Sequence, residues 1–133
     1  MVEINVTYQG DYLFKAVHRP SGVEILTDPP VDNRGKGRSF SPTDLVATAL
    51  GTCMGTTMAF VAERDKIPLE GMKIVVQKEM TAKPIRRIGT LKVTFTLPQK
   101  LPQEILKKLE RAALTCPVHA SLHPEVKIVI LFL

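Results

Sequence analysis

The sequence predicts an α+β fold, in which an antiparallel sheet packs against a long central helix and a second helix. Two observations predict this class. Several segments alternate apolar and polar residues with the period of two that marks half-buried strands, and two others have helical patterns. Their order is three strands, a helix, two strands, a helix and a strand, with mostly short links, which favours α+β over a parallel α/β fold.

The length of 133 residues suits a single domain over residues 1–133. A hydrophobic content of 44% and a charged content of 23% are typical of a globular chain rather than a disordered one. The net charge is +5, but the basic residues are scattered and the aromatic residues are only two Tyr and five Phe. Nucleic-acid binding usually needs a basic face with stacking side chains, so we expect no nucleic-acid partner.

Three strands come first. The residues of 2–8 alternate between apolar and polar, Gly10 and Asp11 predict a hairpin turn, and 12–18 form the returning strand. Residues 23–26 form the third strand. Pro, Gly, Asp and basic residues then predict a flexible basic loop over 28–41, which lacks the Gly-Lys-Ser/Thr ending of a phosphate-binding loop.

The long helix is predicted from Ser41 to about Asp65. Ser41 can cap it, Pro42 suits the first helical position, and Asp44 completes a capping box. In a straight helix Asp44 lies about 13 Å along the axis from Cys53, so we expect it to cap the helix rather than to contact that sulfur. Glycines on either side of Cys53, Gly51 and Gly55, predict the close approach of another element there.

Residues 45–62 carry no charge and approach the length of a membrane span, but their threonines and glycines favour a buried core helix. The first ten residues have no secretory pattern, so we expect a cytoplasmic protein without a membrane partner. A helix that is apolar on most faces is hard to cover in a domain of this size. We therefore expect a homodimer that buries part of it.

The second half supplies the remaining elements. Strands are predicted over 72–80, 91–97 and 126–133. A second helix is predicted from Pro102, and Pro117 should break it just after Cys116.

The two cysteines are the candidate reactive groups. Cys53 lies in the most apolar segment, where a cysteine is often only a small buried hydrophobe and where burial raises the thiol pKa. Cys116 precedes a helix start whose amides would favour a thiolate, and His119 lies one turn further on as a possible activating group. From the residues alone, Cys116 is the better thiolate.

A metal site is the alternative use of these residues. Cys53, Cys116, His119 and His123 make a nominal set of two cysteines and two histidines. However, structural zinc sites usually have two closely spaced ligand pairs, and no Cys-x-x-Cys pair is present. We expect no metal and no bound cofactor.

Two motifs resemble those of the OsmC/Ohr family, the osmotically inducible and organic hydroperoxide resistance proteins. They are Ser-Pro-Thr-Asp-Leu at 41–45 leading to Leu-Gly-Thr-Cys at 50–53, and Leu-Thr-Cys-Pro-Val-His at 114–119. The resemblance implies an OsmC-like fold in an intertwined homodimer. It also implies that Cys53 attacks an organic hydroperoxide and becomes a sulfenic acid, that Cys116 resolves it to a Cys53–Cys116 disulfide, and that a dithiol such as a lipoyl group reduces the disulfide.

The chain departs from the family pattern at two places. Thr43, with Asp44 beside it, stands where the best-characterised members have a Glu, and the first hairpin lacks their Arg. Arg19, Arg34 and Arg38 are candidates to replace that Arg. The resemblance thus predicts a thiol-dependent peroxidase closer to the OsmC-like branch, and the alternative is a non-enzymatic protein that binds a small ligand or senses redox state.

Overall fold

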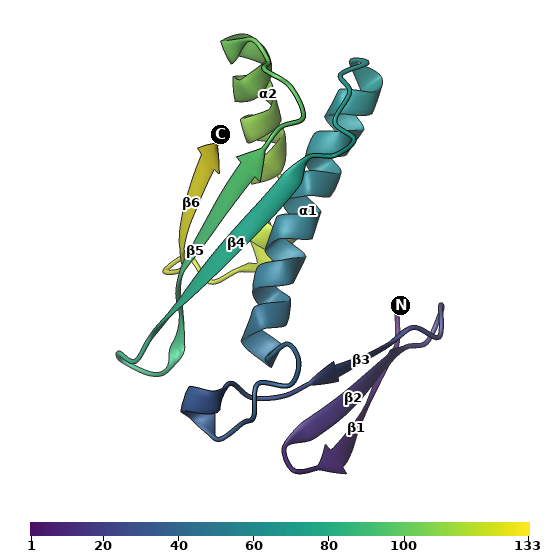
Figure 1. Ribbon diagram of the computed structural model, residues 1–133, viewed down its shortest axis with the longest axis vertical. Coiled ribbons are helices and arrows are strands. Elements are labelled where there is room, and N and C mark those ends of the chain that lie inside the picture. The colour runs from purple at the N-terminus through teal and green to yellow at the C-terminus, as the bar shows by residue number, and fades with distance from the viewer. The chain divides into compact units, whose positions relative to one another are not determined.

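The computed structural model describes residues 1–133 and divides them into two compact units, 1–46 and 47–133 (Figure 1). The sequence predicts one domain over this range. Each unit is described on its own below. The α+β class predicted from the sequence is confirmed, since the chain contains two three-stranded sheets and helices between their strands.

The first unit is an antiparallel sheet in the order β1 (Ile4–Gly10), β2 (Leu13–His18) and β3 (Glu24–Thr27). The turn between β1 and β2 lies where the sequence predicts it. Its residues Gly10 and Asp11 have φ angles of 86° and 54°, which glycine adopts freely and aspartate tolerates better than most residues.

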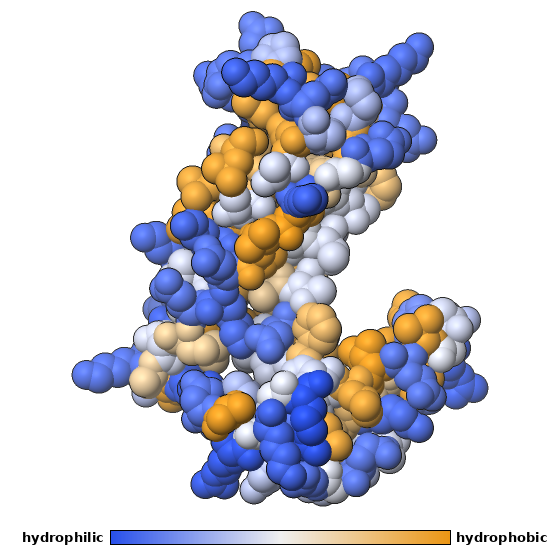
Figure 2. Space-filling model, in the orientation of Figure 1, coloured by the Kyte–Doolittle hydropathy of each residue, from blue (hydrophilic) through white to orange (hydrophobic).

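One face of this sheet is apolar and uncovered. Val6 pairs with Ala16, Ala16 pairs with Ile25, and Tyr8 pairs with Phe14, so these five side chains share a face. The relative exposure of Val6 is 60% and that of Tyr8 is 56%. Figure 2 shows hydrophobic residues gathered on the surface of this sheet. Every buried hydrophobic residue lies in the second unit, so the first unit has no hydrophobic core of its own.

The long helix α1 (Pro42–Arg64) begins and ends within one residue of the predicted positions. Its start has the predicted capping box. The Asp44 backbone N–H donates to Ser41 Oγ at 3.1 Å, and the Ser41 backbone N–H donates to Asp44 Oδ2 at 2.9 Å. This pair satisfies backbone donors that the first helical turn would otherwise leave without partners.

The second unit is a mixed sheet in the order β4 (Lys73–Thr81), β5 (Arg87–Thr96) and β6 (Lys127–Phe132). The antiparallel hairpin of β4 and β5 is as predicted, but the expectation of a wholly antiparallel sheet is wrong, because β6 lies parallel to β5. Two helices, α2 (Gln103–Leu114) and α3 (Pro117–Ser121), separate them. A crossover of this length allows a parallel return, which a short turn does not.

Helix α1 packs against β4 through its two glycines, as the sequence predicts. A Cβ on Gly51 would lie 2.6 Å from Val76 Cγ2, and a Cβ on Gly55 would lie 2.7 Å from Ile74 Cδ1. The helix is long and apolar enough to cross a membrane by length and composition, but in this fold it lies on the sheet and contributes buried Leu50 to the core.

Gly51→Ala should lower the free energy of unfolding by about 1–2 kcal/mol. The added methyl overpacks against the stiff Val76 side chain, and this cost exceeds the gain of about 1 kcal/mol in helix propensity. Gly55→Ala is the matched control, because the nearest atom is the movable end of Ile74 and the cost should be smaller. Urea unfolding of both variants measures the difference, and a Gly51→Ala variant as stable as the wild type would contradict this packing.

A candidate dithiol site

The second unit brings Cys53 and Cys116 together. Cys53 lies in the middle of α1 and is partly exposed, whereas Cys116 lies between α2 and α3 and is fully buried. Both cysteines are free, and their sulfurs lie near enough that Cys53 adds to the effect of burial in raising the pKa of the Cys116 thiol. Two neighbouring free thiols, one of them partly exposed, are the pair of groups that an internal disulfide requires.

Cys116 caps helix α3. Its Sγ accepts a hydrogen bond from the backbone N–H of His119 at 3.2 Å. Burial is the largest influence on its pKa and raises it. The neighbouring Cys53 sulfur also raises this pKa, while the backbone N–H groups of His119 and Val118 lower it without reversing the net rise.

This result corrects the preference for Cys116 as the thiolate. The helix amides are where the sequence predicts them, but they do not outweigh desolvation and the second sulfur. Cys116 therefore keeps its proton to higher pH than an ordinary cysteine, and solvent reaches only Cys53. The more accessible thiol of the pair is the one in the long helix.

His119 reaches the sulfur through its main chain. The hydrogen bond to Cys116 comes from its backbone N–H, and no hydrogen bond joins its imidazole to either thiol. The same backbone contact could be made by any residue except proline. The role predicted for the side chain of His119 therefore has no hydrogen bond to support it.

The residues considered as a zinc set do not form a cluster. No group of three or more His, Cys, Asp or Glu side chains is arranged to hold a metal ion. The ring of His123 instead accepts a hydrogen bond from the backbone N–H of Glu125 at 3.1 Å.

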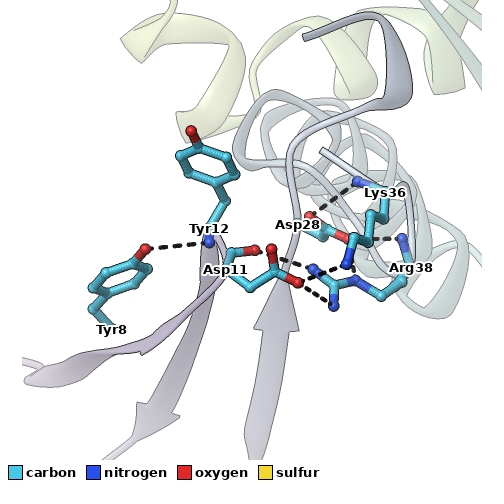
Figure 3. A network of polar contacts seen from close by, with 6 residues as sticks. All are labelled: Tyr8, Asp11, Tyr12, Asp28, Lys36 and Arg38. Atoms are coloured by element: carbon cyan, nitrogen blue, oxygen red, sulfur yellow. Dashed lines mark hydrogen bonds and ion pairs between the residues drawn. The ribbon is translucent and has the colours of Figure 1, made fainter. Parts of the chain in front are cut away.

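Of the candidate arginines, Arg38 is held most firmly. Its Nε donates to Asp28 Oδ2 at 2.7 Å, its Nη1 donates to Asp11 Oδ2 at 3.2 Å, and its Nη2 donates to the Asp11 carbonyl at 3.1 Å (Figure 3). Arg19 pairs with Glu3 at 2.9 Å on the surface of the first unit. Arg34 ends a short 3-10 turn in the left-handed backbone conformation.

Asp28 organises the loop that the sequence predicts to be flexible. It is fully buried and accepts hydrogen bonds from Arg38 Nε and from the backbone N–H groups of Lys36 and Arg38. Lys36 also pairs with Asp11 at 2.9 Å. These contacts tie the basic segment, which the sequence predicts to be a flexible loop, to the turn between β1 and β2. The partners of the buried Asp28 carboxylate lie eight and ten residues away and leave no periodic pattern in the sequence, so these contacts could not be predicted from it.

The pKa of Asp28 falls from 3.8 to about 2, chiefly because Arg38 hydrogen-bonds the carboxylate, with burial opposing the change. A carboxyl group whose pKa is lower in the folded state stabilises that state above pH 3.8, and this contribution is lost as the pH falls towards 2. We expect the melting temperature of the wild type to fall more steeply over this range than that of Asp28→Asn. Asp32→Asn, at an exposed acid of the same loop, is the control, and equal slopes for all three proteins would contradict the network.

Asp44 and Thr43 lie at the start of α1. Asp44 accepts and donates within the capping box, as predicted, and Thr43 Oγ1 lies 3.3 Å from Ser41 Oγ. Capping is thus an established role for Asp44 in this chain, and Asp44 lies nine positions before Cys53 in the same helix.

Comparisons with known proteins agree on one family. The family model described as "OsmC-like protein" matches residues 35–130. A solved structure from Psychrobacter arcticus, whose name suggests induction by osmotic stress and a detoxification response, is 42% identical with a TM-score of 0.95, over 100% of this chain and 96% of the other. No curated protein sequence matches the chain.

More distant structures share the fold. An organic hydroperoxide resistance protein OsmC from Legionella pneumophila is 17% identical with a TM-score of 0.81, over 99% of this chain and 96% of the other. The organic hydroperoxide resistance protein OhrB of Bacillus subtilis is 16% identical with a TM-score of 0.75, over 100% and 98%. At these identities the comparison establishes the fold alone.

Proposed function

Because this chain belongs to the OsmC-like protein family, we propose that it is a thiol peroxidase that reduces organic hydroperoxides with Cys53 and Cys116. The closeness of two free thiols, one partly exposed and one buried, carries this proposal. Some structural relatives are named organic hydroperoxide resistance proteins, which adds support from proteins of the same fold.

The proposed reaction begins at the accessible sulfur. The Cys53 thiolate attacks the terminal oxygen of the hydroperoxide, the O–O bond breaks, and the alkoxide leaves as an alcohol after taking up a proton. Cys53 is then a sulfenic acid. Sulfenic acids condense readily with a nearby thiol, and the free Cys116 thiol lies near Cys53.

The environments of the two sulfurs suit different roles. A peroxide must reach the attacking sulfur, and Cys53 is the partly exposed member of the pair. The raised pKa keeps Cys116 protonated, so it does not compete for the peroxide and can donate its proton when it displaces hydroxide from the sulfenic acid as water. The product is a Cys53–Cys116 disulfide.

The cycle needs an external reductant. A dithiol such as a lipoyl group would exchange with the disulfide through a mixed disulfide and leave oxidised, and the protein itself would need no bound cofactor. We place the protein in the cytoplasm, where such a reductant is kept reduced.

We also propose that the protein is a homodimer. The apolar face of the first unit is a contiguous patch without a core behind it, and patches of this kind in soluble proteins are usually buried by a partner. A second copy of the chain is the partner that the resemblance to the OsmC/Ohr family implies. Multi-angle light scattering measures the state directly.

Steady-state turnover tests the proposed function. Reduced protein should consume cumene hydroperoxide continuously when dihydrolipoamide is supplied, with one dithiol oxidised for each peroxide. The alternative is a non-enzymatic redox sensor or small-ligand-binding protein. Formation of one disulfide per chain without further consumption would favour that alternative and overturn the peroxidase.

A further inference from the structure

Cys116 lies at the junction of two helices. Helix α2 ends at Leu114 and α3 begins at Pro117. The backbone N–H of Cys116 donates back to the Ala113 carbonyl at 3.3 Å, and its carbonyl accepts a hydrogen bond from the Ala120 N–H at 3.1 Å. The cysteine therefore belongs to the end of one helix and to the start of the next, and the regular helical backbone is interrupted at the cysteine itself.

This interruption depends on Pro117. Residues 111–121 contain no glycine and only this one proline. In a continuous helix, proline has no N–H to donate to the Ala113 carbonyl, and its ring would clash with that carbonyl. Proline also disfavours the helical backbone for the residue before it. Cys116 accordingly has φ −65° and ψ 140°, which is an extended conformation.

The extended backbone of Cys116 places its sulfur at the first turn of α3. The Sγ atom accepts the hydrogen bond from the His119 N–H at 3.2 Å, and the Val118 N–H also acts on this sulfur. At the other end of this short helix, Ser121 Oγ donates to the Pro117 carbonyl at 2.8 Å. The Cys116 side chain is fully buried. Backbone groups of α3 thus hold the sulfur in one place.

We propose that Pro117 is a positioning residue for disulfide formation, because it keeps the Cys116 sulfur where it can attack oxidised Cys53. In Pro117→Ala, residue 116 is free to become helical, so α2 can continue into α3 and carry the sulfur away from its amides. The inference deepens the proposed peroxidase and rests on it for the oxidant. A misplacement of about 1 Å between reacting groups can slow a reaction about 100-fold.

The first test needs no peroxide and uses dithiodipyridine, an aromatic disulfide that reports each step by releasing thiopyridone. The Cys53 thiolate attacks one sulfur of the reagent, releases the first thiopyridone and is left in a mixed disulfide. Cys116 loses its proton to solvent, displaces the second thiopyridone and forms the Cys53–Cys116 disulfide. Pro117→Ala should leave the first release unchanged and slow the second about 10- to 100-fold. Equal second releases in the two proteins would overturn the proposal.

Two control variants separate positioning from a general loss of structure. Pro102→Ala removes the proline at the start of α2 and should leave both releases unchanged. Ser121→Ala removes the hydrogen bond at the far end of α3 but keeps the interruption at Cys116, so its second release should stay close to that of the wild type. A Ser121→Ala protein as slow as Pro117→Ala would assign the effect to the stability of α3 and overturn the positioning role.

A second positive variant tests the amide itself. His119→Pro removes the N–H that donates to Cys116, at a position in the first helical turn where proline is tolerated. The second release should slow in this variant as well, with the first unchanged. Wild-type rates in His119→Pro would show that the amides of α3 do not hold the sulfur for reaction.

Reaction with one equivalent of cumene hydroperoxide separates this inference from the proposed function. Pro117→Ala should lose the Cys53 thiol at the wild-type rate but accumulate a sulfenic acid that dimedone traps. If the second thiopyridone release is slow in this variant but neither protein reacts with the hydroperoxide, the peroxidase is wrong and Pro117 still positions Cys116. If both proteins react and form the disulfide at equal rates, the peroxidase stands and the positioning role is wrong.

Discussion

Cys53→Ser should abolish the dithiol-dependent reduction of organic hydroperoxides, with kcat/KM lower by at least about 10⁴-fold. A serine hydroxyl is not ionised at neutral pH and cannot be oxidised to the equivalent of a sulfenic acid, so the first step has no nucleophile. The substitution keeps nearly the same shape at a half-buried position, and the fold should persist. Peroxide consumption with dihydrolipoamide measures the loss, and circular dichroism checks the fold.

Cys116→Ser is the matched control for this experiment. It leaves Cys53 able to react once, because the attacking sulfur and its access to solvent are unchanged. The sulfenic acid should then persist on Cys53, where dimedone traps it. Turnover with a dithiol should fall, because the internal disulfide that the dithiol reduces cannot form. A Cys53→Ser protein that retains turnover, with Cys116→Ser inactive and untrapped, would reverse the assigned roles.

The second large effect is expected on assembly. Val6→Glu places a charge in the middle of the apolar face of the first sheet, next to Ala16 on the adjacent strand and on the face that we propose a second copy covers. Burying a carboxylate there without a partner should raise the dimer dissociation constant at least about 100-fold. Light scattering over a concentration series should show monomer at concentrations where the proposed wild-type dimer persists.

Thr7→Glu is the control for assembly. Thr7 is adjacent to Val6 in β1, is also exposed, and points to the opposite face of the strand. This variant should remain dimeric. Equal dissociation of both variants would contradict the assignment of the apolar face to the interface, and a monomeric wild type would remove the proposed homodimer.

Most elements were predictable because they follow from local patterns, although β1 and β5 are displaced by several residues from the predicted ranges. The alternation of 2–8 and the capping box of Ser41 and Asp44 can be recognised from neighbouring residues alone. Strand β1 overlaps the first of these segments, and α1 begins at the second. The same holds for the glycines on either side of Cys53, since a missing side chain marks a close contact before the partner is known.

Features that depend on distant residues were not predictable. The parallel pairing of β5 and β6 requires the path of the chain through α2 and α3. The clamp of Arg38 between Asp28 and Asp11 joins three separate segments. The raised pKa of Cys116 was not predictable for the same reason. The sequence shows the helix amides, but it does not show the burial and the second sulfur that raise this pKa.

The reaction of the two sulfurs with a peroxide is tested most directly by intact-protein mass spectrometry after one equivalent of an organic hydroperoxide. The wild type should lose two hydrogens per chain, and peptide mapping should join Cys53 to Cys116. Cys116→Ser should instead gain one oxygen, located on Cys53. An unchanged mass in both proteins, or an oxygen on Cys116 with Cys53 untouched, would contradict the account.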